Sequence, residues 1–266
     1  MTAHKHLGNT IAQIREERHR TPLPPGEVDV LSTLVDTQQK QKHDPQQTVA
    51  MTDQQIVDEM VTLLFGGHET TAATLTWIWY ALATYPQARR VYEEVDQVLG
   101  GPGQEPRLPR AEDLERFPYT SMFINECLRL WPPAPFTNRV VMQETELRGY
   151  TLPAGSTCFV CAYSMHHHPT YYPDPDRFDP DRFTPVQKQL RPALAYFPFG
   201  AGPHSCIGMS LAMVELLLAV VTIVRTYQIE RITEEPVEAK MQPSLRPVAF
   251  TMRVKKHVQD QLLVEQ

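Results

Sequence analysis

The pattern of hydrophobic and polar positions predicts one unusually long helix at residues 52–85. It starts at Thr52, because Thr52 and Gln55 match a capping box, in which the N-cap and N3 side chains each bind a free backbone N–H group. A mostly apolar run continues to Tyr85, and the proline at position 86 stops the helix. With a rise of about 1.5 Å per residue, the helix is roughly 50 Å long and crosses a whole domain.

The rest of the pattern predicts a mainly α-helical chain with small β-sheets. Other helices are expected at 1–19, 29–38, 87–98, 118–131 and 209–226, and strands at 139–142, 147–151, 156–162 and 248–254. Polar or proline-rich connections are expected at 21–28, 39–50 and 169–195. No break in the sequence calls for a second domain, so we expect a single domain over residues 1–266.

Composition narrows the class of protein. The 266 residues are 42% hydrophobic, which predicts a packed globule rather than a disordered chain. The net charge of −6 is mixed along the chain without a basic stripe, so we expect no nucleic-acid partner. No apolar run reaches the roughly 20 residues that a membrane-spanning helix needs. Four cysteines do not form a disulfide framework and fit a reducing compartment. We therefore expect a soluble, cytoplasmic protein without a membrane segment.

A glycine-rich loop at residues 196–208 carries the strongest chemical signal. It surrounds Cys206 with glycines and directly precedes the predicted 209–226 helix. The free N–H groups and the dipole of a helix N-terminus favour an anion, and a thiolate is an anion that also ligates metals. Glycine lets the backbone turn tightly and approach a flat or bulky partner. The loop therefore predicts a thiolate held against a metal cofactor, and a buried structural cysteine is the alternative.

Two adjacent glycines, Gly66 and Gly67, lie inside the predicted long helix, where each costs about 1 kcal/mol relative to alanine. Either a partner approaches the backbone closely at this point, or the helix widens locally. Glu69 and Thr70 add an ionisable group and a hydroxyl at the same place in an otherwise apolar helix. The combination suggests a functional polar site, and a solvated Glu-Thr pair on a helix face is the alternative.

Three other patterns are weaker. Glu126 and Arg129 are three residues apart on one predicted helix face, which by itself fits an ordinary surface ion pair. Cys158 and Cys161 are expected on the two faces of a strand rather than at a metal or redox site. The consecutive histidines 166–168 would point in different directions, so we expect no metal ion shared among them.

Three segments resemble signature motifs of the cytochrome P-450 haem-thiolate monooxygenases. The cysteine loop matches Phe-x-x-Gly-x-(Arg or His)-x-Cys-x-Gly at Phe199, Gly202, His204, Cys206 and Gly208. Residues 66–71 match (Ala or Gly)-Gly-x-(Asp or Glu)-Thr-Thr, and residues 178–183 match the meander motif of the family. The resemblance covers nearly the whole chain, but the N-terminal part of the family's usual chain is missing. It implies the C-terminal portion of a cytochrome P-450 fold.

The resemblance implies that the chain binds haem b, which is iron protoporphyrin IX. Cys206 would be the metal ligand through its thiolate, and the electron-rich sulfur would promote cleavage of the O–O bond. The implied cofactor-binding residues are Cys206, Phe199, Gly200, Gly208, Arg139 and His204, of which Arg139 and His204 would bond the haem propionates.

The resemblance also implies which residues surround the cofactor. Glu126, Arg129 and Arg182 would form one buried network behind the cysteine loop, with a role in folding and haem retention rather than in catalysis. Phe136 and Thr137 would line the substrate pocket, and plain core packing is the alternative for both.

The implied activity is insertion of one oxygen atom of O2 into a small apolar organic substrate. Thr70 would hydrogen-bond bound O2, and Glu69 would relay protons from water. Electrons would come from a separate redox partner, a ferredoxin or a flavoprotein reductase, because the chain contains no flavin or iron–sulfur motif.

Two other functions remain open at this point. One is a truncated, non-catalytic fragment that has the sequence of the family but binds haem weakly or not at all. The other is a haem-thiolate enzyme that uses peroxide or rearranges its substrate, although Glu69 and Thr70 argue against it because peroxide users have less need of a proton relay.

Overall fold

The structure is a computed structural model that describes residues 2–21, 23–24, 26–43, 49–100, 107–235 and 237–257. The chain divides into two compact units, residues 1–69 and residues 70–266. Helix α3 (Asp53–Thr84) contributes residues to both units and matches the long helix predicted at 52–85. Its capping box is formed as expected. The Gln55 N–H donates to the Thr52 hydroxyl at 3.2 Å, and the Thr52 N–H donates to the Gln55 side chain at 2.7 Å.

The first unit contains α1 (Thr2–Arg20), α2 (Val30–His43) and the beginning of α3. The Asp53 carboxylate joins all three helices, because Arg15 of α1 pairs with it at 2.9 Å and Gln38 of α2 donates to it at 2.8 Å. Helix α2 continues to His43, past the end predicted at residue 38. The contact of the buried Gln38 side chain with the start of α3 supports this longer helix.

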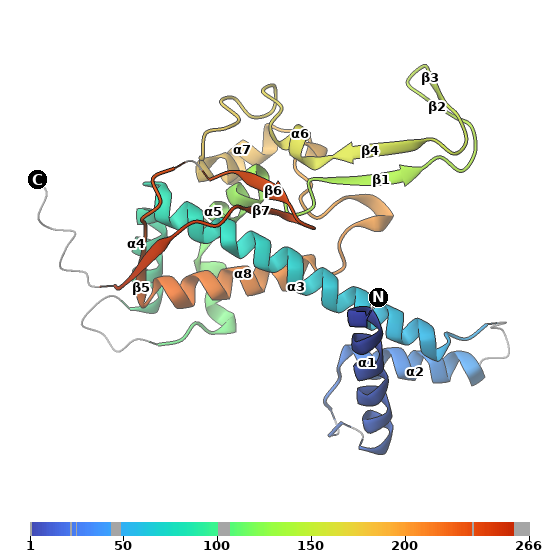
Figure 1. Cartoon of the computed structure of the whole chain (residues 1–266). Coiled ribbons are helices and arrows are strands. Elements are labelled where there is room, and N and C mark those ends of the chain that lie inside the picture. The colour runs from blue at the N-terminus through green and yellow to red at the C-terminus, as the bar shows by residue number, and fades with distance from the viewer. Residues whose placement is uncertain are drawn as a thin grey trace, which may run out of the picture. The chain divides into compact units, whose positions relative to one another are not determined.

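The core of the second unit is formed by the C-terminal part of α3 with α4 (Ala88–Leu99), α5 (Pro118–Leu130) and α8 (Met209–Val224). Figure 1 shows these helices, and both α3 and α8 contribute residues to one hydrophobic cluster. The fully buried members of this cluster include Ile78, Val91, Val95, Phe123 and Val220. The helices predicted at 87–98, 118–131 and 209–226 are thus confirmed, with small differences at their ends.

Among the described residues, four two-stranded antiparallel ribbons complete the second unit. They are β1 (Phe136–Val140) with β4 (Thr157–Cys161), β2 (Thr145–Leu147) with β3 (Tyr150–Leu152), β5 (Tyr227–Arg231) with β8 (Met252–Lys256), and β6 (Ala239–Met241) with β7 (Leu245–Pro247). The single strand predicted at 147–151 is wrong. Arg148 and Gly149 both have positive φ, 49° and 84°, so a tight turn divides the segment into β2 and β3.

Short helices fill the connections between these elements. They are η1 (Ala111–Arg116), α6 (Ala162–His166), η2 (Pro180–Phe183), α7 (Pro185–Gln189), η3 (Ala193–Ala195) and η4 (Gly202–His204). Several of them lie within residues 169–195, for which the sequence predicted only irregular structure. Prolines start η2 and α7, where the missing N–H group carries no penalty.

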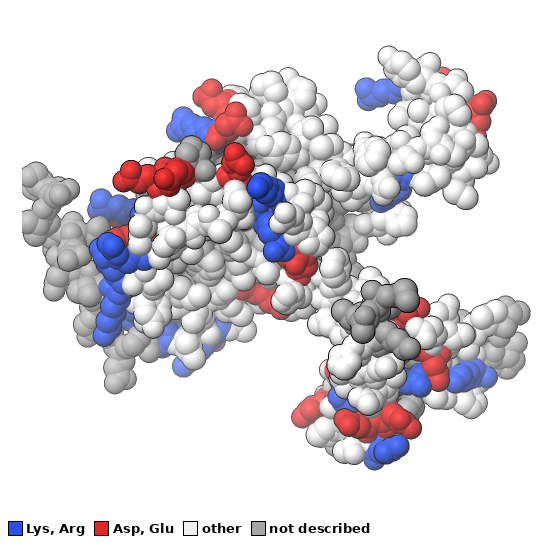
Figure 2. Space-filling model, viewed as in Figure 1, with Lys and Arg blue, Asp and Glu red and all other residues white. Residues whose placement is uncertain are grey.

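The surface of the molecule mixes both charges. Figure 2 shows Lys and Arg interspersed with Asp and Glu over the face in view. Within the part of the chain that the structure describes, no helix combines the length and the apolar character needed to cross a lipid bilayer.

A buried ion pair connects α5 to the segment that follows α6. Glu126 and Arg129 are both fully buried, and two hydrogen bonds of 2.7 and 2.8 Å join the guanidinium to the carboxylate. Arg129 also donates to the carbonyls of His166 at 2.9 Å and Arg177 at 3.2 Å. Burial raises the pKa of Glu126, against the opposing effect of Arg129. The burial excludes the surface ion pair that the spacing alone suggested.

The Glu126 carboxylate has two further partners from the meander segment. It accepts the backbone N–H of Asp179 at 2.8 Å, and the Arg182 guanidinium lies 3.6 Å from the same oxygen. The structure therefore brings together Glu126, Arg129 and Arg182, the three residues that the family resemblance assigns to one network.

His166 is a buried neighbour of this pair. Its side chain is fully inaccessible, and its Nε2 accepts the backbone N–H of Phe197 at 3.0 Å. Burial lowers the pKa of His166 to about 3, so the imidazole is neutral at ordinary pH.

Replacing Arg129 with methionine should lower the free energy of unfolding by about 3–5 kcal/mol, because the Glu126 carboxylate would stay buried without its counter-charge. Urea-induced unfolding at pH 7 measures the change. The double variant Glu126→Gln/Arg129→Met should recover part of this loss, since it removes the uncompensated charge.

The exposed Arg89–Glu93 pair on α4 supplies a control for that measurement. Glu93→Gln should change the free energy of unfolding by less than about 1 kcal/mol, as is usual for exposed ion pairs. A loss in Arg129→Met no larger than in this control would contradict the importance of the buried pair.

The lowered pKa of His166 predicts a pH dependence of stability. The unfolded chain binds a proton at this residue below about pH 6.5, whereas the folded chain does so only near pH 3. The stabilising contribution is therefore complete above pH 6.5 and is lost as the pH falls from 6.5 towards 3. Between pH 7 and pH 5 the loss is roughly 2 kcal/mol. In His166→Gln, which does not titrate, the free energy of unfolding should fall less over this range. Equal slopes for the two proteins would refute the assignment.

Candidate functional site

The cysteine loop, residues 196–208, is held in shape by its own backbone. The Gly200 N–H donates to the Phe197 carbonyl at 3.0 Å, and the Cys206 N–H donates to the Phe199 carbonyl at 2.8 Å. Gly200 and Gly202 both have a φ of +73°, a conformation that side-chain-bearing residues rarely adopt. The glycines at these two positions are therefore explained by the tight turns that fold the loop back on itself.

Cys206 is presented at the surface just before a helix. Its side chain is exposed, and α8 begins at Met209 with Gly208 as its N-cap. By contrast, Cys127 is buried, and the burial raises the pKa of its thiol well above the usual value. The alternative of a buried structural cysteine thus describes Cys127 and not Cys206. An accessible sulfur at a helix N-terminus can bind an external metal as a thiolate.

The residues around Cys206 suit a metal whose remaining ligands are supplied by a cofactor. Among the described residues, no group of three or more His, Cys, Asp or Glu side chains could hold a metal ion. A single accessible cysteine sulfur could ligate the iron of a haem, whose macrocycle would supply other ligands. The residues present therefore fit the cofactor that the sequence implied.

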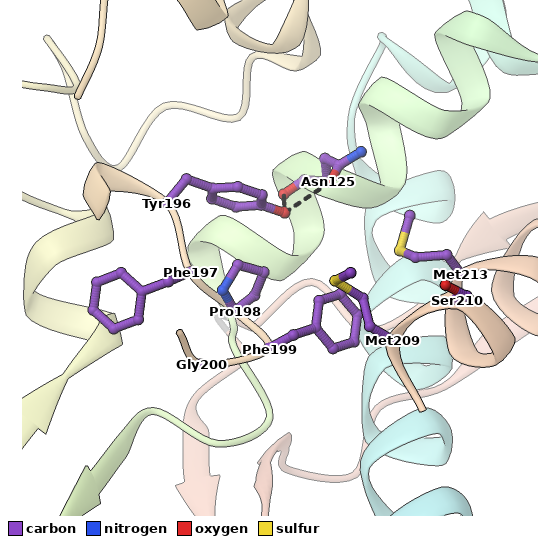
Figure 3. A pocket seen from close by; sticks show the side chains of 9 residues that line it. All are labelled: Asn125, Tyr196, Phe197, Pro198, Phe199, Gly200, Met209, Ser210 and Met213. Carbon is purple, nitrogen blue, oxygen red and sulfur yellow. Dashed lines mark hydrogen bonds between the residues drawn. The ribbon is translucent and has the colours of Figure 1, made fainter. Parts of the chain in front are cut away.

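A cavity of about 370 Å³ lies between the first half of the loop and the start of α8. Figure 3 shows the side chains that line it: Asn125, Tyr196, Phe197, Pro198, Phe199, Gly200, Met209, Ser210 and Met213. The Tyr196 hydroxyl donates to the Asn125 side chain at 2.9 Å and so ties the loop to α5. Burial raises the pKa of Tyr196 well above its usual value, so the phenol stays a neutral donor.

Arg139 and His204 are both exposed, as a contact with an external anion requires. Arg139 lies on β1, opposite Cys158 of β4, and its guanidinium donates to the Asn138 carbonyl at 2.7 Å. His204 ends the short helix η4, two residues before Cys206.

Phe136 and Thr137 are adjacent in β1 and point to opposite faces of the ribbon. Phe136 makes an edge-to-face contact with Phe159 of β4, with ring centroids 5.7 Å apart, and Thr137 shares its face with Arg139. Both predicted pocket residues are exposed, so plain core packing does not describe either of them. Their side chains cannot both face one pocket while β1 stays regular.

Glu69 and Thr70 are half-buried neighbours near the middle of α3. The helix is α-helical throughout Asp53–Thr84, so the local widening considered for Gly66 and Gly67 does not occur. A Cβ atom added at either glycine would meet no described atom within 4 Å beyond the nearby backbone of the helix itself, so there is room for a partner to approach.

The three histidines of the run have different partners, and the cysteine pair lies on a strand. His166 accepts a bond from Phe197, the His167 ring bonds the Tyr163 carbonyl at 2.8 Å, and His168 accepts the N–H of Thr170 at 3.3 Å. Their partners therefore differ, as consecutive residues require. The strand expected around Cys158 and Cys161 is confirmed as β4.

Sequence reasoning missed two residues that touch the loop. His166 was expected only to be structural, and Asn125 had no predicted role, yet each bonds the loop at one of its first two residues. No local signal could have found them, because their partners lie 31 and 71 residues away along the chain.

Comparisons with known proteins agree on one family. The sequence model of the family described as cytochrome P-450 matches residues 1–258. Cyclooctat-9-en-7-ol 5-monooxygenase from Streptomyces melanosporofaciens is 38% identical over 85% of this chain and 47% of its own length. Cyclooctatin synthase from the same organism is 39% identical over 82% of this chain and 45% of its own length.

Solved structures give the same result. The crystal structure of a cytochrome P-450, CYP102L1, matches 95% of this chain and 56% of its own with a TM-score of 0.84 and 26% identity. The chain therefore has a cytochrome P-450 fold in part, and it spans about half the length of the curated relatives it matches. Since the family model covers nearly the whole chain and relatives of this identity align along most of it, the chain belongs to the cytochrome P-450 family.

Proposed function

We propose that residues 1–266 are a single haem-binding domain, the C-terminal portion of a monooxygenase that hydroxylates an apolar organic substrate with O2. The observation that carries the proposal is the exposed Cys206 on a backbone-braced loop at the start of α8. It is supported by membership of the cytochrome P-450 family, in which one relative is named as a monooxygenase.

Haem b would be held by one iron ligand and by contacts at its edge. Cys206 would ligate the iron, while Phe199, Gly200 and Gly208 would contact the macrocycle. Arg139 and His204, both at the surface, would bond the propionates. The haem supplies O2 activation, which the side chains of this chain cannot perform by themselves.

Glu69 and Thr70 would take part in proton delivery during the reaction. The Thr70 hydroxyl can donate a hydrogen bond to bound O2, and the half-buried Glu69 carboxyl can exchange protons with water. Their position beside Gly66 and Gly67 supports this role, because the missing side chains leave space for a ligand to approach α3 there.

For the substrate and for the electron donor, we propose only a general class. Exposed Phe136 or Thr137 on β1 would contact an apolar substrate. The name of one relative specifies cyclooctat-9-en-7-ol, a largely hydrocarbon molecule, and a substrate of that general character fits. A separate ferredoxin or flavoprotein reductase would supply electrons.

A second candidate is a family member that holds haem weakly or not at all. The observation that favours it is the apolar surface of α8, on which Leu211 is 64% exposed and Val214 is 37% exposed. Uncovered apolar surface of this kind favours association over a stable isolated fold. Stoichiometric retention of added haem through gel filtration would rule this candidate out.

Cys206→Ser should abolish the thiolate-type spectrum of the reduced carbonyl complex, because a serine hydroxyl cannot replace the thiolate ligand. The measurement is the absorbance difference after reduction in carbon monoxide. Cys158→Ser, at a partly exposed cysteine on β4, is the matched control and should leave the spectrum unchanged. A normal spectrum in Cys206→Ser would overturn the ligand assignment.

Thr70→Ala should divert electrons from substrate to hydrogen peroxide, because O2 would lose its hydroxyl partner and proton delivery would slow by about 10²-fold or more. The ratio of peroxide formed to NADPH consumed, measured with a reductase and an apolar substrate, should rise. Thr76→Ala removes another α3 threonine, whose hydroxyl bonds the Ala72 carbonyl at 2.8 Å, and should leave the ratio unchanged. An unchanged ratio in Thr70→Ala would favour an enzyme that uses peroxide directly.

A further inference from the structure

His166 connects the buried ion pair to the cysteine loop. Its backbone carbonyl accepts the Arg129 guanidinium at 2.9 Å, and its Nε2 accepts the backbone N–H of Phe197 at 3.0 Å. The imidazole also packs against the rings of Tyr196 and Phe197, with centroids 5.2 and 5.4 Å away. One residue of α6 therefore touches both α5 and the beginning of the loop.

The contact at Phe197 continues to Cys206 through the backbone of the loop. The Phe197 carbonyl accepts the N–H of Gly200 at 3.0 Å, which closes a tight turn around Phe199. The Phe199 carbonyl in turn accepts the N–H of Cys206 at 2.8 Å. Because each bond fixes the position of the next backbone segment, a displacement of Phe197 would be passed on to Cys206.

The chemistry of the imidazole suits this connection. The side chain is fully buried and neutral, so Nε2 remains an acceptor and the proton resides on Nδ1. Without an acceptor at this point, the Phe197 N–H would be left unsatisfied, which a protein interior tolerates poorly. The loop would then have to move to find another partner.

We propose that His166 is a positioning residue that sets the placement of Cys206, because its imidazole holds the Phe197 N–H while its backbone carbonyl is fixed by Arg129. The proposal deepens the proposed function and rests on it only in taking Cys206 as the iron ligand. The role is distinct from that of the ion pair itself, since it concerns one hydrogen bond between a side chain and the loop.

Two variants of similar size separate the hydrogen bond from packing. His166→Gln keeps an acceptor that can reach the Phe197 N–H, whereas His166→Met fills the same space without a strong acceptor. Residue-resolved hydrogen exchange of the full chain, without haem, reports the strength of the loop's own bonds. His166→Asn, which is polar but too short to reach, gives a second loss of contact if His166→Met does not fold.

In His166→Met the amides of Phe197 and Cys206 should exchange about tenfold faster or more, while that of Ile124 in α5 changes less than about twofold. His166→Gln should keep protection at both loop amides. His168→Met, at the exposed end of the same histidine run, is the control and should change none of them. An equal increase in the exchange rates of the Ile124 and Cys206 amides would show that His166 has a purely structural role. Unchanged protection at Cys206 would refute the proposal.

Haem provides a second readout that separates this proposal from the proposed function. When the chain is loaded with haem, part of the reduced carbonyl complex of His166→Met should lose its thiolate-type spectrum, and His166→Gln should retain it. A normal spectrum in all variants would overturn the positioning role. If the unaltered chain fails to bind haem, the proposed function fails, while the exchange experiment still decides the role of His166.

Discussion

The buried pair of Glu126 and Arg129 is the interaction on which the arrangement of the second unit depends. Both side chains are removed from water, where a charge is tolerated only if its donors and acceptors find partners. The guanidinium therefore binds the carbonyls of His166 and Arg177, and the carboxylate binds the N–H of Asp179. Segments that are distant in the sequence are fixed together because two charges have to be satisfied.

The cysteine loop is attached to this frame while its sulfur stays accessible. Tyr196 bonds Asn125 of α5, and Phe197 bonds His166 of α6, so the first residues of the loop are anchored to packed helices. From there the loop relies on its own backbone bonds and on two glycines with positive φ, and Cys206 remains exposed at the start of α8. The loop thus combines a rigid support with an accessible cysteine sulfur.

Elements that nearby residues determine were predictable from the sequence, whereas boundaries that depend on tertiary contacts were not. The start of α3 was correct because Thr52 and Gln55 cap each other within four residues. The prediction of a strand at 147–151 was wrong because Arg148 adopts a left-handed backbone conformation, which is uncommon for arginine. Helix α2 extended beyond its predicted end, where Gln38 is held by Asp53 from another helix. The error at α2 thus falls where the deciding contact lies outside the local sequence.

The sequence by itself determined the chemistry of the candidate site, because the glycine turns, the cysteine and the following helix are contiguous and act over a few residues. It also indicated Arg182 as a partner of the ion pair, but only through the resemblance to a family. The spacing of Glu126 and Arg129 alone fitted a surface ion pair, and the tertiary structure showed that both are buried, as the resemblance implied. Only the tertiary structure showed that His166 meets Phe197. The physical reason is that burial and hydrogen-bond satisfaction depend on partners such as Asp179 and Phe197, which lie 53 and 31 residues away along the chain.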